Sequence, residues 1–229
     1  AEEEIARLTG RLEELDREVR EAAQILTGHR RRVIERLASE VSARLAQLGM
    51  PEGRLAVEHT VAADLDAFTS RGADRAEFLL AANAGRDPLP LAKVASGGEI
   101  SRAMLALKAE AALEDGAPTM VFDEIDAGIG GQVSARVGEA LLELTLKPPH
   151  AQVLCVTHSA QIAALAHQQI AVRKITQDGT SRIVAEDVRG ERRRVELARM
   201  LGGDESDPAV FEHAEVLARE GAKARERAS

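Results

Sequence analysis

Three short runs of polar residues in this chain could carry chemistry. The first is Ser96-Gly97-Gly98-Glu99, at the predicted start of a helix. The unsatisfied N–H groups and the positive dipole end of a helix attract phosphate oxygens, and two glycines let a phosphate approach the backbone closely. A serine followed three residues later by a glutamate is also a common helix start, so this run alone leaves both readings open.

The second run is the carboxylate pair Asp123 and Glu124, directly after the apolar residues 119–122. At the carboxyl end of a parallel strand, the first carboxylate can hold a hydrated Mg²⁺ and the second can orient or deprotonate a water. Successive side chains of a strand point to opposite faces, so the two share a task only if the strand ends between them. The alternative is a pair of solvated acids in a loop, which the dipeptide by itself favours.

The third run ends in His158, after the apolar residues 153–156. A histidine there could donate to a phosphate oxygen or position an attacking water, although a single histidine at a strand end is more often a hydrogen-bonded surface residue. Cys155 lies inside the apolar run. We expect it in the core and not as a nucleophile, because reactive thiols need an electropositive and partly open setting.

The elements that must position these residues alternate between helix and strand. They are a helix over about 99–113, a strand at 119–122, a helix over about 132–144 and a strand at 153–156. Such alternation, with strands apolar on both faces, is typical of a mostly parallel sheet covered by helices, and we therefore expect an α/β fold. We expect Ser96, the carboxylate pair and His158 to converge at one edge of it.

Other segments flank this core. The patterns predict strands at 55–61 and 76–82, a hairpin over 169–188 turning at Asp178-Gly179, and helices over about 191–201 and 208–220, the last with Asp207 as its N-cap.

Residues 1–48 have the spacing of a coiled-coil helix. Apolar residues recur at alternating steps of three and four over 5–26, among Glu and Arg. Gly28-His29 interrupts the pattern, which resumes out of phase over 34–48, as a stutter or a break would produce. Gly49-Met50-Pro51 then ends the helix. The narrow seam favours a partner helix outside these residues over packing on the chain's own globular part.

The composition argues against several classes of protein. With four Phe and no Trp or Tyr in 229 residues, base stacking on aromatic side chains is nearly excluded. A net charge of −8 argues against binding nucleic acid by uniform positive charge. Two basic clusters, at 29–32 and 189–194, could contact backbone phosphate locally. Both are interleaved with or flanked by Glu, however, which is typical of solvated helix faces. One cysteine rules out a disulfide framework, and no apolar run approaches the roughly 18 residues of a membrane span. We expect a cytoplasmic protein without a membrane partner.

The order of the three runs is more specific than any one of them. Asp123 follows Ser96 by 27 positions, and His158 follows Asp123 by 35. In this order they resemble the signature motif, the Walker B strand and the switch histidine of an ABC-type ATPase head, with residues 126–131 where that family has its D-loop. Four phrases extend the likeness, at Lys93–Arg102, Phe122–Gly131, Val156–Gln161 and Leu197–Gly203. They resemble the RecN family of bacterial DNA-repair ATPases, relatives of the SMC proteins, whose heads are split by a long antiparallel coiled coil.

The resemblance implies two parts, a returning coiled-coil arm at 1–48 and the C-terminal lobe of an ATPase head at 49–229. Such heads need a Walker A loop, Gly-x-x-x-x-Gly-Lys-Ser/Thr, to cradle the phosphates of ATP, and this sequence has none. In the resembled family that loop precedes the coil, in an N-terminal lobe of the same protein. This chain alone is therefore expected not to hydrolyse ATP.

The resemblance also implies which phosphate each motif serves. In a homodimer of complete heads, Ser96 and the Gly98 N–H, within the motif that also holds Gly97 and Glu99, would contact the γ-phosphate of ATP held by the second head. Asp126 would touch that second head.

The remaining residues would serve the ATP of their own head. Asp123 would hold Mg²⁺, Glu124 would activate the attacking water, and His158 would contact the γ-phosphate. ATP would close the two heads, hydrolysis would release them, and the coil would convey this cycle to DNA in the nucleoid.

Three alternatives remain open. The chain could be a non-catalytic structural lobe that anchors the coil and dimerises around nucleotide held by a partner. It could be a membrane-transport ABC subunit, which the coil and the lack of any coupling to a membrane segment disfavour. It could also be a coiled-coil adaptor without nucleotide, which requires all three motifs to be coincidence.

Overall fold

The structure is a computed structural model that describes residues 2–85, 87–110, 119–146, 151–177, 180–202 and 207–228. It divides into two compact units. The first unit comprises residues 1–44 and 52–94, and the second comprises residues 45–51 and 95–229. The predicted division into arm and lobe at residue 48 concerns the intact protein and stays a prediction.

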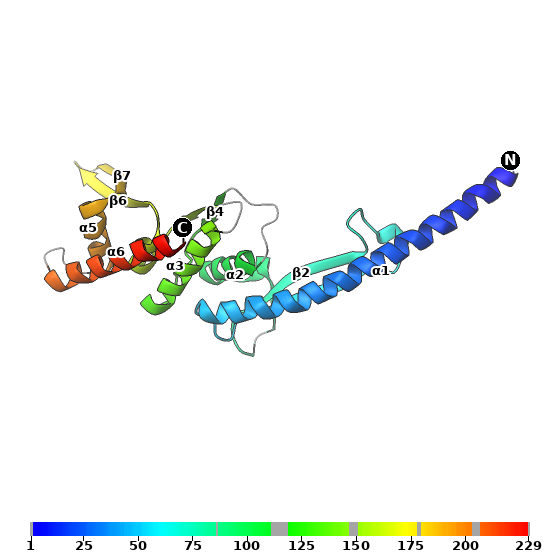
Figure 1. The fold of residues 1–229 in the computed structure, drawn as a ribbon, viewed down its shortest axis with the longest axis horizontal. Helices are drawn as coiled ribbons and strands as arrows, with labels where there is room; N and C mark the ends of the chain where they lie inside the picture. Colours follow the sequence, from blue (N-terminus) through cyan, green and yellow to red (C-terminus); the bar gives the residue numbers. More distant parts are fainter. Residues whose placement is uncertain are drawn as a thin grey trace. The chain divides into compact units, whose positions relative to one another are not determined.

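The first unit is a long helix with a hairpin along it (Figure 1). Helix α1 runs over Glu2–Gln47, and strands β1 (Arg54–Val61) and β2 (Asp74–Ala81) pair antiparallel over their full length. Two 3-10 turns and a short third strand complete the unit, η1 (Leu65–Ala67), η2 (Leu91–Lys93) and β3 (Leu89–Pro90). Because α1 is continuous, Gly28-His29 marks a change of phase and not a break. One interior glycine costs a helix only about 1 kcal/mol.

A buried ionic cluster attaches the hairpin to α1. The Asp74 side chain is 3% exposed and lies 2.7 Å from Arg30 Nη1 and 2.6 Å from His59 Nε2. Arg30 Nη2 also donates to the Arg71 carbonyl at 2.8 Å. Burial raises the pKa of the Asp74 carboxyl, but the hydrogen bonds from Arg30 and His59 outweigh burial, so this pKa lies below its ordinary value. The cluster therefore fixes β1 and β2 on α1 while Asp74 is ionised.

The apolar residues of α1 divide into two groups by exposure. Val41, Leu45 and Leu48, at and just beyond the end of the helix, are buried. The residues of the predicted seam are exposed instead, namely Ile5, Leu8, Leu12, Leu15 and Val19. A continuous exposed seam of this kind is what a coiled-coil partner helix would cover.

The second unit contains a parallel strand pair with helices packed around it. Strands β4 (Thr119–Phe122) and β5 (Gln152–Cys155) pair in parallel, which confirms the predicted α/β fold with a parallel sheet. The helices are α2 (Gly97–Glu110), α3 (Gly131–Leu146), α4 (Ala160–Leu165), α5 (Gly190–Met200) and α6 (Pro208–Ala228). Asp207 caps α6 as predicted, because its Oδ1 accepts a hydrogen bond from the Ala209 N–H at 2.9 Å.

A hairpin follows α4. Its strands β6 (Gln169–Gln177) and β7 (Thr180–Val188) pair antiparallel, as the sequence predicts. The predicted turn at Asp178-Gly179 lies outside the described residues, as do the predicted last three residues of the helix over 99–113 and Gly203 of the last motif.

Helix α4 is held tightly on two sides. A Cβ at Gly138 of α3 would lie 2.6 Å from Leu165 Cδ1, and a Cβ at Gly221 of α6 would clash with the Ala164 carbonyl. Arg193 Nη2 and Arg225 Nη1 donate to that same carbonyl, at 3.2 and 2.7 Å. Because α4 begins two residues after His158, these contacts also fix the chain that carries the histidine.

Both strand pairs of the second unit leave apolar side chains in solvent. Those that are exposed are Val121 of β4, Leu154 of β5, Ile170, Val172 and Ile175 of β6, Ile183 of β7, and Val156 just beyond β5. These side chains form apolar surface that is uncovered in this chain. No helix in the described part of the chain has the length and apolar character needed to cross a membrane.

Candidate functional site

The parallel strand pair brings two of the polar runs to one edge of the second unit. The register aligns Phe122 with Cys155, and the Val156 N–H donates to the Phe122 carbonyl at 2.9 Å. Asp123 and Glu124 therefore leave β4 beside the point where Thr157 and His158 leave β5. Ligands of α/β proteins bind at this carboxyl edge of a parallel sheet.

The backbone turns sharply at the carboxylate pair. Strand β4 ends at Phe122, before both acids, so strand alternation no longer places them on opposite faces. Glu124 has φ +53°, the left-handed region that costs an L-residue about 1 kcal/mol, and it is the one non-glycine residue there in the described ranges. Both side chains belong to exposed residues. The turn thus presents the two carboxylates to solvent at the end of the strand.

The amino end of α2 lies against the same turn. Ser96 Oγ accepts a hydrogen bond from the Glu99 N–H at 3.3 Å, as an N-cap residue does. A Cβ at Gly97 would lie 2.9 Å from Glu124 Oε2, and a Cβ at Gly98 would lie 3.1 Å from the Glu124 carbonyl. The glycine pair therefore permits close packing on Glu124 of the same chain, in addition to any contact with phosphate.

Two residues of α2 that the motif reading did not single out hold this turn in place. Ser101 Oγ donates to the Asp123 carbonyl at 2.7 Å. Arg102, which is 5% exposed, donates from Nη1 to the carbonyls of Ile125 and Ala127, each at 3.1 Å. Burial lowers the pKa of the Arg102 guanidinium. The sequence signals for this role are the place of both residues in the phrase Lys93–Arg102 and, for Arg102, an arginine among the apolar positions of a helical pattern.

Asp126 points inward. Its side chain is 2% exposed, and Oδ2 accepts hydrogen bonds from Thr157 Oγ1 at 2.5 Å, the His158 N–H at 2.9 Å and the Ser159 N–H at 3.0 Å. The predicted contact of Asp126 with a second head is not tested by a single chain and stays a prediction. What the single chain does show is that this carboxylate binds the segment that carries His158.

His158 is presented to solvent. Its side chain is 81% exposed, with Nδ1 3.2 Å from Asp126 Oδ2. Cys155, three residues earlier, is half-buried, and burial, followed by the charges of Asp126 and Asp123, raises the pKa of its thiol to about 12. Such a thiol is protonated at neutral pH, which agrees with the expectation that Cys155 is not a nucleophile.

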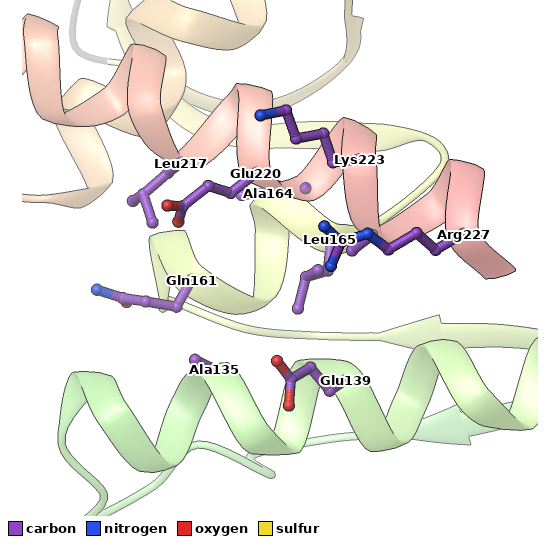
Figure 2. Close-up of a pocket in the computed structure, with 11 residues that line it drawn as sticks. Ala135, Glu139, Gln161, Ala164, Leu165, Leu217, Glu220, Lys223 and Arg227 are labelled. Carbon is purple, nitrogen blue, oxygen red and sulfur yellow. The ribbon is translucent and has the colours of Figure 1, made fainter.

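A cavity of about 410 Å³ lies elsewhere in the second unit, between α3, α4 and α6. Figure 2 shows the charged side chains of Glu139, Glu220, Lys223 and Arg227 around it, together with Leu165 and Leu217. None of the candidate residues lines this cavity. Its lining mixes acidic, basic and apolar side chains and identifies no particular ligand.

The edge offers carboxylates that could contribute to binding a magnesium nucleotide. Mg²⁺ commonly binds one or two protein carboxylates together with phosphate oxygens and water, and a single exposed Asp123 fits that pattern. The described residues hold no cluster of three or more His, Cys, Asp or Glu that would bind a metal without such phosphates. A lysine-bearing phosphate loop is absent from the sequence. The edge is therefore suited to complete a nucleotide site and not to form one alone.

The comparisons with known proteins bear on the family and the fold of the chain. No family model matches the chain. The chain is 41% identical over 204 residues to the DNA repair protein RecN of Streptomyces coelicolor, covering 85% of this chain and 35% of that protein. It is also 41% identical over 211 residues to the DNA repair protein RecN of Treponema pallidum, covering 91% of this chain and 36% of that protein. The chain thus spans about a third of the length of these relatives.

One solved structure supports the fold. The Smc head domain with an extended coiled coil, bound to the C-terminal domain of ScpA, from Pyrococcus furiosus, superposes with a TM-score of 0.52 at 22% identity, covering 81% of this chain and 43% of that one. The matches to the RecN proteins fall in their C-terminal part. The predicted resemblance is therefore confirmed, and this chain is related to the C-terminal part of the RecN family of DNA repair proteins.

Proposed function

We propose that this chain is the C-terminal part of a RecN-like ATPase that acts in the repair of DNA double-strand breaks and in recombination. The observation that carries the proposal is the parallel register of β4 and β5, which sets Asp123, Glu124 and His158 at one edge. Identity of about 41% to RecN proteins over most of the chain supports the same assignment. A protein that repairs bacterial DNA acts in the cytoplasm, at the nucleoid.

Within a complete head, each residue of the edge has a separate task. Asp123 holds Mg²⁺, which neutralises phosphate charge when bound. Glu124 orients and deprotonates the water that attacks the γ-phosphate, and His158 donates to an oxygen of that phosphate. The left-handed turn at Glu124 supports this assignment, because strained backbone conformations of this kind cluster at functional sites.

The amino end of α2 serves the second head of a homodimer. There Ser96 Oγ and the N–H groups of Gly97 and Gly98 bind the γ-phosphate of the partner's ATP, with Glu99 N–H held by Ser96 and residues 127–131 facing the partner. ATP shared in this way binds the closed pair of heads more tightly than the open ones, so binding closes the pair and hydrolysis opens it.

An N-terminal lobe of the same protein completes the head. It supplies the Walker A loop and covers the apolar side chains that β4 to β7 leave in solvent, such as Val121, Val172 and Ile183. These side chains are 62 to 77% exposed here, and burying them would contribute about 1.5 to 3 kcal/mol each. Without that lobe this chain does not hydrolyse ATP.

Contact with DNA is assigned to the coiled coil and not to the basic cluster at 189–194. In that cluster Arg189 pairs with Asp187, Arg192 with Glu186 and Arg194 with Glu191. Arginines already neutralised by neighbouring acids release fewer counterions on binding a phosphate backbone. The exposed apolar seam of α1 pairs with the outgoing arm of the same coil.

The test is Glu124→Gln in the intact protein, with Glu186→Gln on β7 as the matched control. The amide keeps the size of Glu124 but cannot take a proton, so we expect turnover of ATP to fall by about three orders of magnitude or more while ATP binding stays within about threefold. Steady-state hydrolysis and equilibrium binding of a fluorescent ATP analogue measure the two quantities. Unchanged turnover would remove Glu124 from the reaction and favour the non-catalytic structural lobe.

A further inference from the structure

We infer that Asp126 is a positioning residue for His158, whose buried carboxylate fixes the segment 157–159 and thereby the imidazole at the edge. The inference deepens the proposed function and rests on it for the reaction that His158 serves. The contacts that support it lie within the second unit and involve no ligand.

The hydrogen bonds to Asp126 all come from one short segment. A single oxygen, Oδ2, accepts from the Thr157 hydroxyl and from the N–H groups of His158 and Ser159. Ser159 N–H donates to Thr157 Oγ1 as well, at 2.9 Å, which closes the segment on itself. A carboxylate that is 2% exposed is costly to bury unless donors compensate for its lost water, and hydrogen bonds to an ionised acceptor are the stronger kind.

The same oxygen acts on the imidazole. His158 Nδ1 lies 3.2 Å from Asp126 Oδ2, whereas the histidine side chain is 81% exposed. The Asp126 carboxylate thus lies against both the backbone N–H and the imidazole of His158. Asp126 therefore sets the place of the histidine at the edge.

The backbone on either side of Asp126 is itself anchored. Arg102 donates to the carbonyls of Ile125 and Ala127, the two neighbours of Asp126 in sequence. Helix α2, which begins at Gly97, thus holds the turn from one side, and the turn holds the histidine segment on the other. The positioning of His158 consequently depends on the same helix that carries Ser101 and the glycine pair.

A double-mutant cycle in the intact protein tests the inference. We expect Asp126→Ala to lower kcat for ATP by about ten- to a hundredfold, the usual effect of removing a group that orients a reacting residue, with the KM for ATP within about threefold. In the His158→Ala background the same change should lower kcat by less than about twofold, because its effect runs through the histidine. Equal losses in both backgrounds would overturn the inference.

A second measurement needs no ATP hydrolysis. Hydrogen exchange of the peptide over residues 156–161, followed by mass spectrometry, should be at least about tenfold faster in Asp126→Ala, because the His158 N–H loses its acceptor and the Ser159 N–H keeps only Thr157 Oγ1, itself no longer held by Asp126. Asp126→Asn, whose amide oxygen can still accept, should keep most of that protection and should restore kcat to within about tenfold of the original protein. Asp187→Ala, on the exposed end of β7, is the matched control and should change neither quantity.

The two measurements separate the possible failures. If exchange is faster in Asp126→Ala but the original protein does not hydrolyse ATP, the proposed ATPase is refuted. The role of Asp126 in holding residues 157–159 of the original protein would still stand. Unchanged exchange would overturn the positioning role whatever the activity. If Asp126→Ala does not fold, the same cycle is run with Asp126→Asn, and equal losses of kcat with and without His158 again overturn the inference.

Discussion

Two buried aspartates, one in each unit, are held in opposite ways. The Asp74 side chain, 3% exposed, is surrounded by the cationic side chain of Arg30 and by His59. The Asp126 side chain, 2% exposed, is held by one hydroxyl and two backbone N–H groups, and the histidine beside it is open to solvent. Glu196 of the second unit follows the pattern of Asp74, since it pairs with Arg173 and Arg199.

The difference indicates what each acid is for. Asp74 and Glu196 contact other structural residues. The ion pairs of Asp74 hold the β1–β2 hairpin on α1, and the ion pair of Glu196 with Arg173 holds β6 against α5. At Asp126 the contacts hold a chain segment whose histidine, His158, is exposed to solvent. Asp123 and Glu124, three and two residues earlier, are exposed and form no ion pair within the described ranges.

Among the changes that test this comparison, we expect replacing Asp74 to have the largest effect, on the stability of the β1–β2 hairpin. Asp74→Ala should destabilise the β1–β2 hairpin by about 2 kcal/mol, because it leaves His59 and a partly solvated Arg30 without their acceptor. Hydrogen exchange of the hairpin amides in the intact protein measures this loss. Turnover of ATP per folded molecule should stay within about twofold, in contrast to the loss at Asp126.

The pH dependence checks the same point. The pKa of Asp74 is lowered in the folded protein, so its contribution to stability is present above the pKa of the unfolded chain and is lost as the pH falls through the lower folded-state pKa. Hairpin protection should therefore fall below about pH 4 in the original protein, and Asp74→Asn should lack this component. A hairpin equally acid-sensitive in both proteins would contradict the assignment.

A smaller effect is expected at Cys155. Its thiol pKa of about 12 leaves roughly one thiolate in ten thousand at pH 8, so alkylation by iodoacetamide should be very slow. Burial is the main cause and the charge of Asp126 the next, so Asp126→Asn should lower this pKa and raise the alkylation rate by about two- to fivefold. Asp74→Asn should not change the rate. Peptide-resolved mass spectrometry measures the labelling, and fast labelling of the original protein would refute the burial argument.

The sequence predicts most of the elements of this fold because local signals define them. The apolar runs at 119–122 and 153–156 give β4 and β5, and Asp207-Pro208 gives the start of α6. The exposed seam over 5–26 is likewise visible in its spacing. These features depend on neighbours a few residues apart, which is the range over which periodicity and capping operate.

Features that depend on distant contacts were not predictable. The heptad phase alone does not tell whether Gly28-His29 breaks α1, since either a stutter or a break shifts it. That Asp126 turns inward toward Thr157, 31 residues further along the chain, follows from the pairing of β4 with β5. The packing role of Gly221 depends on α4, far away along the chain. Such residues look like ordinary polar or small residues until the fold brings their partners beside them.

The central claim is that Ser96 serves the ATP of the second head while Glu124 serves the ATP of its own, although Gly97 lies against Glu124 within one chain. The most direct test mixes two inactive variants of the intact protein, Ser96→Arg and Glu124→Gln. In a two-fold dimer, only the mixed pair assembles one site with both residues intact. The account predicts that equal mixing after subunit exchange restores about a quarter of the original ATP turnover. No recovery, with exchange verified by mass spectrometry, would contradict it.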